Sequence, residues 1–503
     1  RAHEAEAQAW LEEREANPAF LRAYGRTEAT RAWLDRSLAS PDMPRERLVQ
    51  LLSWVYRFGA TEDSTARLGE LLQPPTDALP LPTRLDPSLQ VRLDGMAPLQ
   101  VVARDGEVFL FLQDEADCRI FRLHDGQARL QADIPLQDDG SPLPGLQKFS
   151  FAVEDGMVIL YGDRWMHLGT DGRMRTRTLP GVIGSLSPLT RIGSLAAFLI
   201  DGRRDGLRLV LIDLPSGEVF LDREVSGSPE RLQQVVANER WLFLLQDRSP
   251  EVLRVDLRRE APVLSFTLPF APRYSEVMAA RPFGDGLAIP ASRGSHGSAL
   301  HLLEPGMPTR TLPLDGMEFD AFKVPQGFGW WTRPLGRLGE APQPRTLNYL
   351  QPGSPRPWQL RMPVASTRML PYQGRSGWRQ QPPTREVVVA EPGLDGGTRL
   401  RGLELGGVRE RWRLEIADLP FDLLEEPQPL PVRGETGWAV LLRESGTRRT
   451  GPRLHTVLVD DQGRLLDRYD SPSRASSRAA QELFAVPGGV LLRHGDAMTL
   501  LQD

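Results

Sequence analysis

Few side chains in this sequence have the type and spacing that metal binding requires. His296 and His301 are the only close pair of histidines, and no cysteine lies near them to complete a zinc site. The paired aspartates at 138–139 and at 460–461 offer two carboxylates each, whereas calcium takes about six to eight oxygen ligands. We therefore expect surface or turn histidines and solvated turn aspartates, with no metal ion and no cofactor.

The motifs of the common catalytic sites are missing as well. There is no G-x-S-x-G nucleophile elbow, because GRSGW at 374–378 has the wrong spacing. There is no G-x-x-x-x-G-K-[ST] phosphate loop, no H-E-x-x-H zinc helix and no repeated Asp-box of the sialidase kind. Two carboxylates brought together by folding stay open as an alternative. The sequence therefore predicts no catalytic residue.

The segment from Trp330 to Arg385 has the residue types that bind other macromolecules. It contains nine arginines and one acid, Glu340, so nine minus one gives a local charge of +8 in a chain whose net charge is -5. Arg and aromatic side chains are enriched at protein–protein hot spots, and they also suit phosphates and stacked bases. The candidate partner-binding residues are Trp330, Trp331, Arg333, Arg345, Arg356, Trp358, Arg375, Trp378 and Arg379.

Three interpretations of this segment are open. Proline-stiffened loops between ordinary strands would pack the aromatic side chains inward. A protein-binding face would expose them. A nucleic acid or anionic lipid surface would use the arginines. Because the whole chain is acidic, we expect other protein subunits as partners and no nucleic acid.

The elements that carry these residues are short strands in repeated groups of four. Residues 100–135 contain four strands, with Asp-Gly turns at 105–106 and 125–126, and residues 148–180 repeat the pattern. Gly takes positive φ freely and Asp bonds its own backbone, so these dipeptides favour tight hairpins. First hairpin turns recur about every 48 residues to the end of the chain, within the range of WD40 and kelch blades.

A four-stranded unit that recurs along a chain is typical of a β-propeller. We predict a mainly β fold with one propeller over residues 88–503 and eight blades, with seven or nine as alternatives. Nine turns can be counted, but about four to eight blades is usual, so we interpret residues 330–385 as a long loop insertion. We also expect Gln90 to Leu93 to pair with a strand from the last twenty residues, since such closure removes exposed sheet edges.

Residues 1–73 differ from the rest in having helical periodicity. Residues 48–56 place apolar side chains at i, i+3, i+4, i+7 and i+8, the stripe of an amphipathic helix. We predict three or four short helices and a proline-rich linker at 74–87. The region is either a cap packed on the propeller or an arm that docks another subunit or a membrane protein. The candidate docking residues are Trp10, Phe20, Trp33 and Trp54.

Composition leaves the cellular compartment open. The single cysteine, Cys118, cannot form an intrachain disulfide, and the longest apolar runs are far shorter than the roughly 20 residues of a membrane helix. The sequence starts at Arg1 and not at Met, so a preceding signal peptide or anchor is an open alternative. We favour a bacterial periplasmic or envelope-associated location over a cytoplasmic one. Membrane association is expected only through a partner or a missing N-terminal anchor.

The strand-turn-strand LVLIDLPSGEVFLDREV at 209–225 resembles the repeat of quinoprotein-type (PQQ-like) β-propellers, in which an Asp precedes a Thr/Ser-Gly turn. VLVDDQGRLLDRYD, IFRLHDGQARLQADI and MHLGTDGRMRTRTL are similar to weaker copies of it. The tryptophan that follows the turn in that family is missing, and Phe220 or Leu221 sits near its place. The resemblance implies the propeller fold, and this departure puts a quinone cofactor in doubt.

A propeller is a rigid disc with loops on both faces, which suits multi-sided binding. We interpret the chain as a non-enzymatic scaffold or accessory subunit that binds other proteins in a larger, envelope-associated assembly. The alternative is a degenerate quinoprotein-like or hydrolase-type enzyme with its site in the central funnel. Clustered acids with a metal in the funnel would favour the enzyme, and an apolar or sealed funnel would favour the scaffold.

Overall fold

The computed structural model describes most of the chain. The described residues are 2–14, 16–40, 42–58, 62–72, 83–113, 117–135, 148–181, 190–201, 207–225, 232–238, 240–256, 264–269, 280–292, 298–314, 317–322, 324, 327–334, 345–362, 368–369, 386–405, 409–421, 428–431, 437–444, 453–471 and 481–502.

Five helices lie in the described N-terminal part, where three or four were predicted. They are α1 Ala2–Glu13, α2 Pro18–Tyr24, α3 Glu28–Leu38, α4 Arg45–Phe58 and α5 Glu62–Leu72. Helix α2 begins where the Asn17 side chain accepts hydrogen bonds from the backbone N of Ala19 and Phe20 at 3.0 and 2.9 Å, a typical N-cap. No helix within the described residues is long and apolar enough to span a bilayer.

Nine antiparallel sheets of four strands follow the helices. In order from the first strand of each sheet, the first four are β2 Ala97–Arg104, β3 Glu107–Gln113, β4 Asp117–His124, β5 Gln127–Pro135; β6 Lys148–Val153, β7 Gly156–Tyr161, β8 Arg164–Gly169, β9 Met174–Thr178; β10 Thr190–Ile192, β11 Leu195–Asp201, β12 Leu207–Asp213, β13 Val219–Val225; and β14 Leu232–Ala237, β15 Trp241–Gln246, β16 Glu251–Asp256, β17 Leu264–Thr267.

The remaining five sheets complete the chain. They are β18 Arg281–Phe283, β19 Gly286–Ser292, β20 Ser298–Leu303, β21 Arg310–Pro313; β22 Met317–Phe322, β23 Phe328–Pro334, β24 Thr346–Leu350, β25 Trp358–Arg361; β26 Arg368–Met369, β27 Glu386–Pro392, β28 Thr398–Glu404, β29 Arg409–Ile416; β30 Gln428–Pro431, β31 Gly437–Glu444, β32 Arg453–Asp460, β33 Leu465–Asp470; and β34 Gln481–Val486, β35 Gly489–His494, β36 Ala497–Gln502 with β1 Asp86–Arg92.

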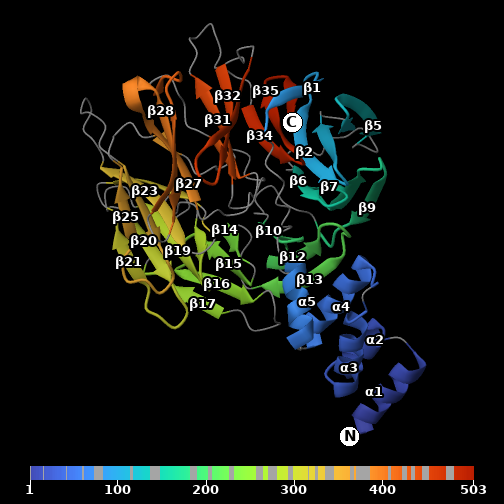
Figure 1. The fold of residues 1–503 in the computed structure, drawn as a ribbon. Coiled ribbons are helices and arrows are strands. Elements are labelled where there is room, and N and C mark those ends of the chain that lie inside the picture. The colour runs from blue at the N-terminus through green and yellow to red at the C-terminus, as the bar shows by residue number, and fades with distance from the viewer. Residues whose placement is uncertain are drawn as a thin grey trace.

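These sheets are the nine blades of one β-propeller (Figure 1). The first strands of neighbouring blades contact each other, as β2 contacts β6 and β34, and β14 contacts β10 and β18, so they line the axis. The predicted fold class is confirmed, and with it the fold that the quinoprotein-type resemblance implies. The preferred number of eight blades was one too few. Residues 330–385 are no insertion, because they contain strands β24 and β25 and parts of two complete blades.

The ring closes by pairing the two ends of the propeller, as predicted. Strand β1 runs antiparallel to β36, with Gln90 opposite Thr499 and Arg92 opposite Ala497. The backbone N of Leu93 extends the pairing by donating to the carbonyl of Asp496 at 2.9 Å. The last blade therefore takes its outermost strand from the start of the propeller.

Each blade has two ends, which define the two faces of the disc. Calling the strands A to D from the axis outward, the A–B and C–D turns lie on one face, which we name the AB face. The B–C turns and the connections to the next blade lie on the other, the BC face. Because consecutive strands are antiparallel, a strand end identifies its face directly.

The helical arm, residues 2–72, is joined to the propeller through a common core. One hydrophobic cluster runs from Leu51, Leu52 and Val55 of α4 to Phe220 and Leu221 of β13. The ring of Tyr56 meets that of Phe220 edge-on at 6.1 Å. Figure 1 shows α4 and α5 next to the third blade and α1 to α3 extending away from the disc.

Candidate functional site

Asp213 ends strand β12 and organises the turn that follows it. Its Oδ2 accepts hydrogen bonds from the backbone N of Ser216 at 3.1 Å and from the Ser216 Oγ at 2.7 Å. The backbone N of Gly217 donates to the Asp213 carbonyl at 2.8 Å, and Gly217 adopts φ +69°, which costs glycine no strain. The Asp, Ser and Gly of the quinoprotein-like motif therefore close a turn around a fully buried carboxylate.

A tryptophan from the second blade packs on this turn. Trp165 in β8 donates its indole Nε1–H to the carbonyl of Leu214 at 2.8 Å. Its ring is so close to Gly217 that a Cβ there would come within 2.6 Å of the indole. An indole does cover the turn, but it comes from a neighbouring blade and not from the residues after the turn. Sequence reasoning missed it for that reason.

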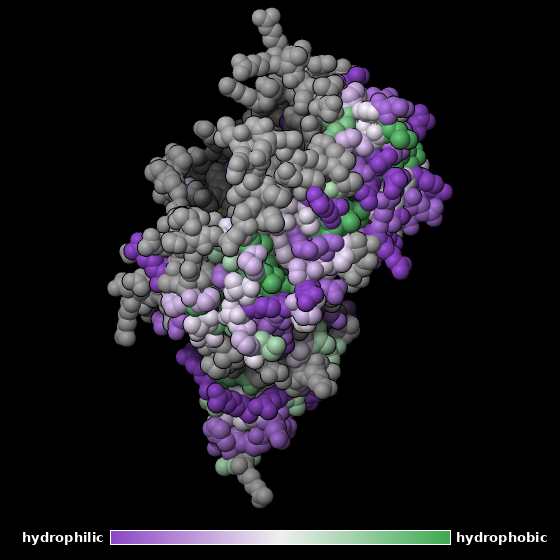
Figure 2. Space-filling view, turned by 90° about the vertical axis from the view of Figure 1, so that its left-hand side faces the viewer, coloured by the Kyte–Doolittle hydropathy of each residue, from purple (hydrophilic) through white to green (hydrophobic). Residues whose placement is uncertain are grey.

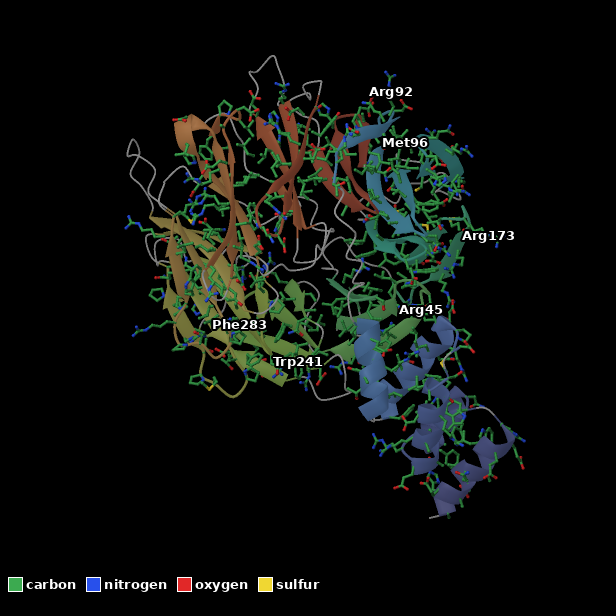
Figure 3. All side chains as sticks on the ribbon, viewed as in Figure 1. Arg45, Arg92, Met96, Arg173, Trp241 and Phe283 are labelled. Atoms are coloured by element: carbon green, nitrogen blue, oxygen red, sulfur yellow. The ribbon has the colours of Figure 1, made fainter. Side chains whose placement is uncertain are left out.

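Arg45, which Figure 3 labels on α4, completes the surroundings of Asp213. Its Nε donates to Oδ2 at 3.1 Å and its Nη2 to Oδ1 at 2.9 Å, the two-pronged geometry that suits a carboxylate. The carboxylate is fully buried, whereas the arginine side chain is 40% exposed. A cation from the arm thus neutralises a buried anion of the third blade.

Two further polar contacts fix the arm on the AB face. Ser194 in the A–B turn of the third blade donates its Oγ–H to the Leu71 carbonyl of α5 at 2.9 Å. The neighbouring Gly193 has φ +57°, and a Cβ there would come within 2.2 Å of the α5 backbone. On the fourth blade, the Tyr56 hydroxyl donates to the Asp256 carbonyl at 2.6 Å. The third and fourth blades therefore both hold the arm.

A polar cluster around His167 on the second blade lies next to helix α4. The Nη2 of Arg175 lies 3.2 Å from Nδ1 of His167, and since a guanidinium only donates, Nδ1 accepts. The imidazole Nε2 then donates to Asp155 Oδ1 at 2.8 Å. This hydrogen bond, with the charge of Arg175, lowers the pKa of Asp155. Nη1 of Arg175 also lies 4.0 Å from a carboxylate oxygen of Glu46 on α4.

The residues considered for metal binding are engaged in local contacts. His301 is buried in β20, not at the surface or in a turn, and its Nδ1 lies 3.1 Å from Oγ1 of Thr311. His296 and the aspartates at 138–139 lie outside the described residues. Asp460 is the last residue of β32 and is buried, so it is not the solvated turn aspartate that was expected; it accepts a hydrogen bond from Nε of Arg464 at 2.7 Å, while Asp461 lies exposed in the turn. Within the described ranges, no three His, Cys, Asp or Glu side chains gather closely enough to hold a metal ion.

The candidate partner-binding residues do not form one exposed group. Trp330 and Trp331 are neighbours in β23, and their side chains enter the cores shared with the fifth and the seventh blade. They are 2% and 4% exposed. These two side chains therefore pack inward and are not exposed as a binding face requires. Arg356 is exposed, and Arg345 and Trp358 are half-buried. The side chain of Arg333, and all of Arg375, Trp378 and Arg379, lie outside the described residues.

The topology also divides this segment between the two faces. Strand β23 ends at Pro334 and β24 begins at Thr346 on the BC face. Strand β26 ends at Met369 and β27 begins at Glu386 on the AB face. The two connections therefore start and finish on opposite faces of the disc.

The aromatic side chains proposed for docking pack within the arm. Trp10 stacks on Phe20 at 5.7 Å, and Trp33 stacks on Trp54 at 6.2 Å between ring centroids. Phe20 and Trp54 are buried, while Trp10 and Trp33 are half-buried. Each stacked pair thus contributes one ring to the core of the arm and leaves part of the other at its surface.

Glu386 is a buried carboxylate between the seventh and eighth blades. Its Oε1 accepts indole N–H hydrogen bonds from Trp412 and, at 3.0 Å, from Trp438. Burial raises the pKa of Glu386, and the two indole donors offset part of that effect. The folded chain therefore binds this proton more tightly than the unfolded chain does, and stability falls as pH rises above about 4.5 toward the raised pKa.

Replacing Glu386 by Gln is expected to stabilise the protein at neutral pH and leave it unchanged near pH 4. The amide oxygen can still accept from the indoles, and each unit of pKa shift that is removed corresponds to about 1.4 kcal/mol. Urea midpoints at pH 4.5, 6 and 7.5 measure the effect. The matched control is Asp155→Asn. Because the pKa of Asp155 is lowered in the folded chain, removing this carboxylate should destabilise the protein at neutral pH. Parallel pH profiles for wild type and the Gln variant would contradict the prediction.

Comparison with known proteins gives similarity at the level of fold only. No family model matches the sequence, and no curated protein matches it. The solved structures that are similar include the C-terminal WD40 domain of Sif2, at 9% identity over 81% of this chain and 98% of that chain, with a TM-score of 0.35.

Two other similar structures have the names of enzymes. One is the quinohemoprotein alcohol dehydrogenase ADHIIG from Pseudomonas putida HK5, at 10% identity over 87% of this chain and 79% of that chain, with a TM-score of 0.39. The other is a post-proline cleaving enzyme from Rickettsia typhi, at 11% identity over 97% of this chain and 65% of that chain, with a TM-score of 0.39. Similarity this distant does not decide whether the chain is an enzyme.

Proposed function

We propose that the chain is a non-enzymatic scaffold subunit that binds other proteins, with the helical arm as a docking element. The observation that carries this proposal is the anchoring of the arm. Helices α4 and α5 are held on the AB face by a shared core, the Arg45–Asp213 pair and hydrogen bonds to two blades. Helices α1 to α3 project from this fixed base (Figure 1). A rigid projection presents a partner with a surface at low entropic cost.

The partner would contact a mainly polar surface on the arm. Figure 2 shows the lower end of the molecule, where the arm lies, as largely hydrophilic on the side in view. The partly exposed rings of Trp10 and Trp33 supply the aromatic contacts that interfaces favour. Arg356, Arg345 and Trp358 on the sixth blade remain candidates for a second contact. Membrane association would follow from the partner, in an envelope-associated assembly.

Native mass in an extract of the source organism tests this proposal. We expect the wild-type chain to elute with partners, well above the 56.2 kDa of one chain. Ala9→Arg and Ala32→Arg place bulky cations at exposed positions of α1 and α3 and should release a monomer without unfolding the arm. Ala128→Arg, at an exposed position of β5 on the rim, is the matched control and should leave the assembly intact. A wild-type monomer would refute the scaffold proposal.

A further inference from the structure

The interface between the eighth and ninth blades is apolar toward the AB face of the disc and polar toward the BC face. Toward the AB face, Leu458 of β32 and Val490 of β35 belong to one hydrophobic cluster. Toward the BC face, the register places Gln481 of β34 opposite His494 of β35. Side chains two residues apart on a strand share one side, so Gln481 and His494 lie on the same side as Leu483 and Leu492 and face the eighth blade.

Several polar side-chain atoms at this interface are buried without a hydrogen-bond partner in the described part of the chain. Both Nε2 and Oε1 of Gln481, which is 6% exposed, lack one among the described residues. Oγ1 of the fully buried Thr456 and Nε2 of His494 lack one as well. Buried polar groups are nearly always hydrogen-bonded, because an unpaired one costs free energy. Three of these atoms belong to Gln481 and His494, which face each other directly in the register, and they point to a bound group that pairs with them.

This interface is held together across the blades and includes an arginine. Oγ of Ser471, which follows β33, lies 3.1 Å from Nδ1 of His494. Thr456 lies on the same side of β32 as Leu454 and Leu458, which belong to the cluster shared with the ninth blade, and its position opposite Leu441 is one step closer to the AB face. Arg443 is two residues from Leu441 of that cluster and faces the same way. Burial lowers the pKa of His494, so the imidazole is neutral at pH 7.

We propose that the buried polar groups of this interface, Gln481, His494, Thr456, Ser471 and Arg443, bind a small oxyanion: the carboxylate of a small organic acid, or phosphate. The amide Nε2, the threonine hydroxyl and the guanidinium are donors, which suits acceptor oxygens. The amide Oε1 can take a hydrogen bond from an O–H of the ligand. Binding here is non-covalent and separate from the arm, so it does not depend on the scaffold proposal.

Titration calorimetry of the full chain with sodium phosphate, acetate and succinate, at ionic strength matched with chloride, tests the proposal. We expect one site per chain for at least one probe, and the probe that binds identifies phosphate or carboxylate as the preferred class. Gln481→Leu should weaken binding at least tenfold, and without ligand it should fold as well as wild type because leucine replaces an unpaired amide. Thr456→Val provides the same test if Gln481→Leu does not fold.

The matched control is Gln100→Leu. Gln100 is also a buried glutamine on an innermost strand, but its Nε2 donates to the Ser150 carbonyl at 3.2 Å. This variant should bind the probe with unchanged affinity. No binding by any probe, or equal binding by Gln481→Leu, would overturn the proposal and assign the unpaired atoms to trapped water.

Discussion

A disulfide between cysteines at positions 92 and 497 is expected to raise the unfolding free energy by about 2–5 kcal/mol. Arg92 of β1 and Ala497 of β36 face each other in the closing pair of strands, and Arg92 lies at the outer surface (Figure 3). The crosslink would enclose nearly the whole propeller, and a disulfide that closes a long loop removes the most entropy from the unfolded chain. Thermal midpoints of the Arg92→Cys/Ala497→Cys variant, oxidised and reduced, measure the gain.

The reduced form of the same variant is its own control, and the two single-cysteine variants show any cost of the substitutions. Cys118 is buried, so it should not compete for the new bond. The gain tests ring closure itself, since β1 and β36 come from opposite ends of the propeller. A crosslink that fails to form, or oxidised and reduced forms with equal midpoints, would contradict the pairing of these strands.

Local pattern was enough to predict the blades because propeller strands are joined by short turns with characteristic residues. Asp105 and Gly106 adopt φ of 51° and 79°, and Asp125 and Gly126 adopt 48° and 67°, the left-handed values that Asp-Gly hairpins require. The closure at Gln90 to Leu93 was predictable for a related reason. A last blade with three strands leaves an unpaired edge, which the first strand can cover.

The number of blades was harder to predict, because the seventh blade departs from the pattern. Its first strand, β26, has two residues, and residues 370–385 separate it from β27. Neither feature resembles the regular hairpins elsewhere. The tryptophans of β23 were misleading for a different reason. A strand buried on both sides carries large apolar side chains at adjacent positions, so Trp330 and Trp331 indicate two interblade cores and not an exposed surface.

Part of the site on Asp213 could be predicted from the sequence. An Asp before a Ser-Gly turn was recognised as a motif, and such an aspartate, if buried, needs a cation. The sequence could not say which cation, since Arg45 lies 168 residues away and arginine supplies almost all of the 61 basic residues. The contact of Trp165 with this turn could not be predicted either, because it depends on which blades are neighbours in the ring. Contacts of this kind follow from the closed architecture and not from local spacing.

Replacing Arg45 by Ala is expected to loosen the arm from the propeller at a cost of about 2 kcal/mol. Removing one partner of a buried pair costs about 3–5 kcal/mol. Because Arg45 is 40% exposed, water can solvate Asp213 in part once the arginine is gone, which lowers this cost. The Asp213 carboxylate would keep its two hydrogen bonds from Ser216, both to Oδ2. Hydrogen exchange measures the effect: amides of α4 and α5 should exchange faster, whereas those of the sixth to eighth blades should not change.

Two further variants separate the ion pair from general damage to the arm. Arg36→Ala removes an exposed arginine of α3 whose Nε donates to the Ala32 carbonyl within its own helix, and it should leave exchange in α4 and α5 unchanged. The double variant Arg45→Ala/Asp213→Asn removes both charges, so it should recover much of the loss, because the cost of Arg45→Ala comes from the carboxylate left buried without a cation. If the double variant is as loose as Arg45→Ala plus Asp213→Asn added together, the two residues are not coupled. The arm would then depend on the shared apolar core of α4 and β13 alone.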